Sequence, residues 1–283
     1  MNTVERSLRG FLPLALSGFL IGAMPSAHAQ QFMVSPEMPE AYQPFALRLI
    51  VPCGGNSLDP ASVEVDPSSA SIVIASYSAD FTCPPDPKLA NVMGVPGGTY
   101  SIERIRPDDR VVDQVYGDIT IAPAPPTQPV FAFFNQDIGH YFITAGTAEK
   151  DSLLSGGGGG GWMIVDKSFD AWPADGPAPD AAKPVCRFYS AAVNSHFYTA
   201  GPNECELLKQ PGSGWTYEGI AFRALVPTQG SCYPGTTPVW RLYNDRFAQA
   251  DSNHRFVTSA DTYRHMIANG WIGEGVAFCS PES

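Results

Sequence analysis

Histidines recur at nearly equal spacing in the second half of this 283-residue chain. His140, His196 and His254 each open a short strand-like segment, and we expect them to occupy equivalent places in three repeats. Three imidazoles related in this way could meet at a common axis and bind zinc. The competing hypothesis is a local hydrogen bond within each repeat. It is favoured because no carboxylate or cysteine accompanies the histidines at a ligand spacing. We therefore expect structural histidines, and no metal or other cofactor.

Two glutamates, Glu218 and Glu274, also stand at equivalent positions, each followed by glycine. A pair of carboxylates facing one cleft is the acid and base of many glycosidases. Arginine recurs as well, at Arg187 and Arg241 on the first strand of the same two repeats. In the first repeat Ala132 replaces the arginine and Val165 replaces the glutamate. Because loss of one partner would leave a charge alone, loss of both predicts structural ion pairs, Arg187–Glu218 and Arg241–Glu274.

Aromatic side chains are the strongest binding candidates, because flat rings stack well on sugar rings. One tryptophan in each repeat follows a glycine, and we expect these three to anchor the core: Trp162, Trp215 and Trp271. The remaining candidates lie on the first strands or outside the regular pattern: Tyr189, Tyr243, Trp240, Tyr217, Tyr233 and Trp172. The last three are expected to be exposed and therefore available to a ligand.

These residues belong to a sequence unit that is repeated three times, over 129–183, 184–237 and 238–283. Each unit is expected to hold a strand, a second strand, a short helix and a third strand. A unit of this size cannot bury its apolar face alone, so the three units should share one core around a pseudo-threefold axis. The predicted closure is β-trefoil-like or propeller-like.

The repeated motifs resemble a family of secreted bacterial repeat domains of unknown function, over about residues 130–281. The motifs are V-x-R-[FL]-Y, H-[FR]-[FY] and G-W-x-x-E-G-[IV]-A-F. The first repeat departs from them, with "WMIVDKSFDAW" as its third strand and a glycine run over Gly156–Gly161. The resemblance implies an accessory module beside secreted hydrolases, with a cell-wall or extracellular polymer as ligand. It implies no activity for the repeat itself.

The segment upstream, residues 30–121, predicts a β-sandwich. Strand patterns start at Phe45, Ser71, Gly97 and Val115, and turn clusters separate them. The stretch "GGTYSIERI" and the strand after it resemble immunoglobulin-like modules of secreted bacterial proteins. A Pro-rich linker over 122–128 follows. No catalytic constellation occurs in this domain, so its expected role is support.

The first 29 residues have the pattern of a signal peptide. Arg6 and Arg9 precede an apolar run over 11–24, and small residues before Gln30 suit cleavage near Ala29. No later run reaches the roughly 18 apolar residues of a membrane span. The formal net charge of −11 argues against nucleic-acid binding, which needs a basic surface. We expect a secreted or periplasmic protein.

Six cysteines lie downstream of this segment, and an even number in an exported chain predicts disulfides. Cys53 and Cys83 are expected to pair within the sandwich. The other four permit three connectivities. We favour Cys232 with Cys279, which bracket the last repeat, and this leaves Cys186 with Cys205.

The leading functional hypothesis is a non-enzymatic binding or adhesion module for an extracellular polymer or cell-surface glycan, most simply a carbohydrate-binding protein. The alternative is an extracellular hydrolase, or a protein that accompanies or inhibits one, acting through the mouth of the repeat ring. An enzyme should concentrate a cleft and a perturbed histidine or glutamate where the symmetry breaks. A binder should repeat aromatic patches around the ring.

Overall fold

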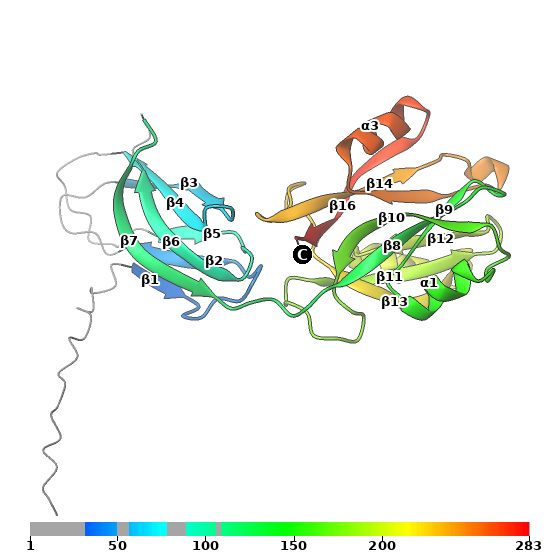
Figure 1. The fold of residues 1–283 in the computed structure, drawn as a ribbon, viewed down its shortest axis with the longest axis horizontal. Helices are drawn as coiled ribbons and strands as arrows, with labels where there is room; N and C mark the ends of the chain where they lie inside the picture. The colour runs from blue at the N-terminus through cyan, green and yellow to red at the C-terminus, as the bar shows by residue number, and fades with distance from the viewer. Residues whose placement is uncertain (1–31, 50–56, 78–88, 106–108, 283) are drawn as a thin grey trace, which may run out of the picture. The chain divides into compact units, whose positions relative to one another are not determined.

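The computed structural model describes residues 32–49, 57–77, 89–105 and 109–282, which are mainly β-strand (Figure 1). The predicted signal peptide, Cys53 and Cys83 lie outside the described residues. Strands up to residue 121 form one part of the chain, and three strand-and-helix units from residue 128 form the other.

The N-terminal part contains two sheets. One has the order β1-β2-β5, formed by β1 (Phe32–Ser35), β2 (Phe45–Leu49) and β5 (Leu89–Val92). The other has the order β3-β4-β6-β7, formed by β3 (Ser57–Asp66), β4 (Ser71–Tyr77), β6 (Gly98–Ile105) and β7 (Val112–Ile121). Leu47 and Val92 of the first sheet share a core with Ile72, Ile102 and Ile119 of the second. The two sheets therefore bury one common apolar layer, as a sandwich does.

Each C-terminal unit follows the predicted order of strand, strand, helix and strand. The first unit contains β8 (Gln128–Asn135), β9 (His140–Thr144), α1 (Thr147–Leu154) and β10 (Trp162–Ala171). The second contains β11 (Lys183–Ser190), β12 (Ser195–Thr199), α2 (Pro202–Leu208) and β13 (Thr216–Ala224). The third contains β14 (Thr236–Tyr243), the short 3₁₀ helix η1 (Phe247–Gln249), β15 (His254–Val257), α3 (Ala260–Ala268) and β16 (Ile272–Pro281). In every unit the first strand is central and pairs antiparallel with the other two.

Local sequence explains where the helices begin. Ser259 caps α3 by accepting a hydrogen bond from the Thr262 amide at 3.2 Å. Pro202 opens α2, where its missing amide proton costs nothing. Both α1 and α2 follow a Thr-Ala-Gly turn, in which the hydroxyls of Thr144 and Thr199 accept from the glycine amide two residues later at 2.9 Å.

Three phenylalanines form the centre of the repeat domain. Phe169, Phe222 and Phe278 come from the third strands of the three units and are all buried. Their ring centroids lie 5.5, 5.6 and 5.9 Å apart, within the usual range for aromatic pairs. The strands that carry them, β10, β13 and β16, contact one another. The three sheets thus share one core, as the repeat pattern predicts.

The contact between the central strand and the helix is made by different chemistry in each unit. In every unit, one end of this contact is the fourth residue of the helix. The other end is the residue that follows a buried valine in the central strand. The three contacts are Lys150 above the Phe131 ring at 5.2 Å, the Cys186–Cys205 disulfide, and Trp240 stacked on Tyr263 at 5.7 Å. A cation–π contact, a covalent bond and an aromatic stack therefore fill one structural role.

Both disulfides favoured for the C-terminal cysteines are present. Cys186 is bonded to Cys205, and Cys232 is bonded to Cys279 across 47 residues. The second bond ties the segment before β14 to β16.

Candidate functional site

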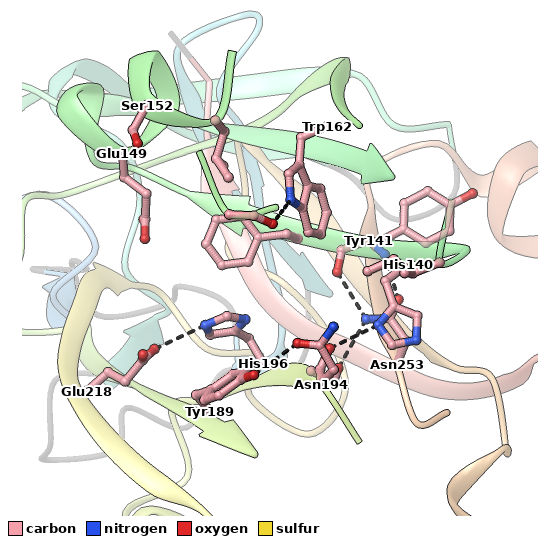
Figure 2. A pocket seen from close by; sticks show the side chains of 15 residues that line it. His140, Tyr141, Glu149, Ser152, Trp162, Tyr189, Asn194, His196, Glu218 and Asn253 are labelled. Atoms are coloured by element: carbon pink, nitrogen blue, oxygen red, sulfur yellow. Dashed lines mark hydrogen bonds and ion pairs between the residues drawn. The ribbon is translucent and has the colours of Figure 1, made fainter. Parts of the chain in front are cut away.

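A cleft of about 480 Å³ opens between the first and second units (Figure 2). This volume lies within the range of ligand pockets. One wall comes from the first unit and the other from the second. Figure 2 shows Glu149, Ser152 and Trp162 on one side, and Tyr189, His196 and Glu218 on the other. The site is therefore built at a boundary between repeats.

Aromatic rings form a continuous wall across this boundary. The His196 ring lies 4.9 Å from the ring of Tyr189 in its own unit and 4.8 Å from the ring of Phe142 in the first unit. Phe142 in turn meets Trp162 edge-on at 5.9 Å. The four rings come from β9, β10, β11 and β12, because facing side chains on these strands point into the junction.

Arg187 holds one carboxylate from each unit. Its Nε lies 2.9 Å from Glu218 Oε2, which is the predicted ion pair. Its Nη1 lies 2.8 Å from Glu149 Oε2 and 3.1 Å from Glu149 Oε1. The three side chains are 22%, 27% and 35% exposed, in the order Arg187, Glu218 and Glu149. One guanidinium thus faces two carboxylates, and the group carries an excess of negative charge.

His196 completes this group. Its Nε2 lies 3.3 Å from Glu218 Oε2. Burial, followed by the positive charge of Arg187, lowers the pKa of His196 to about 4, and Glu149 opposes part of the shift. The imidazole is therefore neutral at pH 7. A neutral ring is a hydrogen-bonding group for an uncharged ligand, and it is a poor proton donor at that pH.

The same arrangement recurs between the second and third units. Arg241 Nε lies 2.8 Å from Glu274 Oε2, the second predicted pair, and Nη1 lies 3.9 Å from Glu204 of the preceding helix. His254 Nε2 lies 3.4 Å from Glu274 Oε2. The His254 side chain is only 9% exposed, and burial followed by the charge of Arg241 lowers its pKa to about 3. Its ring is sandwiched like that of His196, with Phe197 and Tyr243 both at 5.0 Å.

The third junction has lost every member of the charged group. Ala132 stands in place of the arginine, Val165 in place of the strand glutamate, and Thr262 in place of the helix glutamate. All three line one small hollow. Arg255 occupies this boundary instead, with its guanidinium 4.3 Å from the Tyr141 ring. The sequence predicts that the arginine and the strand glutamate are lost together, and the structure shows that the helix glutamate is lost with them.

The prediction that the three histidines are equivalent is wrong. In the strand pairing, His196 lies opposite Tyr189 and His254 lies opposite Tyr243, but the matching residue opposite Phe134 is Tyr141. One extra residue between His140 and the following Thr-Ala-Gly turn places His140 one step earlier, so it faces the other side of its strand. The three imidazoles cannot converge. Within the described residues, no cluster of three His, Cys, Asp or Glu side chains could hold a metal ion.

His140 belongs to a buried polar group at one end of the cleft. Its structural equivalents are Ser195 and Asn253, and the Asn253 amide donates to Ser195 Oγ at 3.1 Å. His140 Nε2 lies 2.7 Å from Asp251 Oδ1, and Nδ1 lies 3.1 Å from the Asn194 carbonyl. These contacts join all three units, and His140, Asn194, Ser195 and Asn253 also line the cleft.

Tyr189 is the one predicted binding aromatic that lines the cleft. Trp162, expected to be a core anchor, lines it as well, with its Nε1 donating to the Gly158 carbonyl at 3.1 Å. The prediction that Trp172 is exposed is wrong. It is fully buried and donates to the Pro125 carbonyl at 2.9 Å, because the segment before the repeats packs over it.

The other predicted aromatics lie elsewhere. Tyr217 is 39% exposed and lies under the Lys209 ammonium, which is 4.6 Å from its ring centroid. Tyr233 is half-buried. Trp240 and Tyr243 are half-buried and stack on Tyr263 and His254. Sequence patterns alone missed the cleft residues Glu149, Ser152, Asn194 and Asn253. For Glu149, the recurrence of glutamate at the third helical position in α1 and α2 was the available signal.

The chain belongs to a family of uncharacterised domains. The family model described as "Domain of unknown function (DUF5648)" matches residues 129–281, more than half of the chain and all three units. No curated protein and no solved structure matches the chain. None of the described helices is long and apolar enough to cross a membrane.

Proposed function

We propose that this DUF5648 member is an exported, non-enzymatic binding protein that holds a polysaccharide or cell-wall polymer in the cleft between its first two repeats. The observation that carries the proposal is the aromatic wall formed by Tyr189, His196, Phe142 and Trp162. Sugar rings have apolar faces that pack against such rings and hydroxyl edges that need polar partners.

The polar groups of the cleft suit an uncharged ligand. His196 is neutral at pH 7, and Ser152 and Asn194 are exposed side chains that exchange hydrogen bonds with hydroxyls. The carboxylates of Glu149 and Glu218 give the cleft a negative excess, and the whole chain carries a formal charge of −11. Both features disfavour an anionic polymer.

The alternative is an extracellular hydrolase, or a protein that accompanies or inhibits one. Its support is the His196–Glu218 contact in a cleft that also contains Glu149. Against it, the same histidine, glutamate and arginine recur at the second junction, where His254 is almost fully buried and reaches no substrate. A constellation that is repeated at a closed junction is better explained by its role in joining the units.

We also propose how the three sheets of the repeat domain close and to which class the N-terminal domain belongs. The three sheets are proposed to close as a β-trefoil-like or propeller-like ring around Phe169, Phe222 and Phe278, and the N-terminal sandwich is proposed to be an immunoglobulin-like support. Export by a signal peptide ending near Ala29 is supported by the two disulfides, which persist in oxidising compartments.

Affinity electrophoresis tests the binding proposal. The mature chain should be retarded in gels that contain one of four polymers: hydroxyethyl cellulose, laminarin, glycol chitin or soluble peptidoglycan. Ser152→Trp places a large ring in the cleft from an exposed helical position and should abolish the retardation, and Tyr189→Ala should weaken it at least about tenfold. The matched control is Leu207→Trp, at the equivalent exposed position of α2.

The outcomes separate the two functions. Retardation that Ser152→Trp and Leu207→Trp leave equally strong would place the binding surface outside the cleft. If no polymer retards the chain, and incubation releases product that disappears in His196→Ala or Glu218→Gln, the hydrolase hypothesis replaces the binding one. Tyr217→Ala adds a check, because an exposed aromatic outside the cleft should not matter.

A further inference from the structure

A second hollow of about 550 Å³ lies beside the cleft, at the junction of the third unit with the first. Its walls are the turn between β8 and β9, the segment between β14 and β15, and the end of α3. The lining side chains that matter here are Ile138, Asn244, Arg246, Asp251, Asn269 and Trp271. Ile138 lines the cleft as well, so the two depressions meet at one exposed residue that is 40% accessible.

The second hollow is the counterpart of the cleft under the pseudo-threefold symmetry. In the cleft, Trp162 of the first unit faces Asn194 in the β-turn of the second. In the second hollow, Trp271 of the third unit faces Ile138 in the equivalent turn of the first. Both tryptophans stand at the start of a third strand. The same two structural elements therefore form both depressions.

The two depressions are also joined by side chains. The Trp271 ring meets the ring of Tyr141 edge-on at 5.9 Å, and Tyr141 lines the cleft. Asp251 lines the second hollow and holds His140, which lines the cleft, at 2.7 Å. The relative position of the two depressions is thus fixed by partly buried contacts, so a ligand that reaches both would meet a pre-organised surface.

The chemistry of the second hollow resembles that of a sugar subsite. It offers one half-buried indole ring, the exposed side-chain amide of Asn269, and an internally neutralised ion pair in which Arg246 Nε lies 2.6 Å from Asp251 Oδ2. Amides both donate to and accept from hydroxyl groups, and a paired charge adds no net attraction for an ion.

We infer that the second hollow is a further subsite for the same polymer, and that the protein binds an internal stretch of an extended neutral polysaccharide across Ile138. This inference rests on the proposed function and deepens it, because it selects a long chain over a monosaccharide or a chain end. Contacts in the second subsite become intramolecular once the first is filled, so affinity rises steeply when an oligomer is long enough to reach both.

Isothermal titration calorimetry with three oligomer series tests this inference: cello-, laminari- and N-acetylglucosamine oligomers from the dimer to the hexamer. The mature chain should bind the hexamer of one series at least about tenfold more tightly than the dimer. Asn269→Tyr, which fills the second hollow from an exposed helix end, should remove this gain and leave dimer binding unchanged. Gln210→Tyr, at an exposed site just after α2, is the control.

Trp271→Ala is the second variant, with circular dichroism to confirm its fold, and it should also remove the gain in affinity of the hexamer over the dimer. Equal affinity for dimer and hexamer, or a hexamer gain that survives both variants, would overturn the second subsite and leave the proposed function standing. Absence of binding for every oligomer of all three series would overturn the proposed function and the subsite together.

Discussion

His140 Nε2 lies 2.7 Å from Asp251 Oδ1, joining the first unit to the third across 111 positions of sequence. The Nδ1 atom of the same ring lies 3.1 Å from the Asn194 carbonyl of the second unit. Both partners present an oxygen atom to the ring. Asp251 is held in turn by Arg246 at 2.6 Å. A single side chain, only 4% exposed, therefore connects all three units near the cleft.

His140→Leu should lower the free energy of unfolding of the repeat domain by about 2 kcal/mol, because it removes the partly buried contacts of both ring nitrogens with the Asp251 carboxylate and the Asn194 carbonyl. All five tryptophans lie in the repeat domain, so tryptophan fluorescence during urea unfolding reports on this domain selectively. His265→Leu, on the exposed side of α3, should change the value by less than about 0.5 kcal/mol. Equal effects of the two substitutions would mean that the His140 contacts contribute nothing.

Stability should fall as the pH drops below about 6.5, the pKa of an unfolded histidine. Burial lowers the folded-state pKa of His196 to about 4 and that of His254 to about 3. The unfolded chain therefore binds more protons between pH 6.5 and these values, and stability rises with pH across that window. Each histidine contributes on the order of 3 kcal/mol of pH dependence.

Urea unfolding at pH 7 and pH 4.5 measures this effect. His254→Phe keeps an aromatic ring between Phe197 and Tyr243 and removes the titrating group, so its stability should depend less on pH than that of the wild type. A pH dependence that this substitution leaves unchanged would assign the acid sensitivity to other groups.

The Cys232–Cys279 disulfide should stabilise the last unit by about 4 kcal/mol, the chain-entropy value for a loop of 47 residues. Ser replacement of both cysteines should lower the free energy of unfolding of the repeat domain by roughly this amount. The Cys186–Cys205 bond closes a shorter loop of 19 residues, so the same double replacement there should cost about 3 kcal/mol. A larger loss at Cys186 than at Cys232 would contradict the loop-length explanation.

Sequence patterns predict features that are local to one unit. The order of strand, strand, helix and strand follows from apolar periodicity and turn residues, and the Arg241–Glu274 pair follows from matched gains and losses. Contacts between units are different, because a sequence does not state which repeat faces which. Glu149 binding to Arg187 and Asp251 binding to His140 are both of this kind. They decide where the cleft lies.

The predictions for His140 and Trp172 are wrong for clear physical reasons. His140 and His196 share a residue type, but strand position depends on the count from the following turn, and a single extra residue reverses the face. Trp172 looked exposed because it lies outside the repeated pattern. Its burial depends on the irregular segment before β8, including Pro125, whose packing has no periodic signal in the sequence.

Arg187 should show three-way coupling with its two carboxylates. Removing either Glu149 or Glu218 leaves one partner for the guanidinium, whereas Arg187→Met leaves two carboxylates facing each other and should cost more than either, roughly 3 kcal/mol. In a double-mutant cycle, Arg187→Met with Glu218→Gln should lose less than the sum of the single changes, with a coupling of about 1 to 2 kcal/mol because the side chains are partly solvated. The exposed pair Lys209–Glu206, at 2.8 Å in the same unit, is the matched control and should couple by less than about 1 kcal/mol. Additive losses for Arg187 and Glu218 would show that the guanidinium and this carboxylate do not interact.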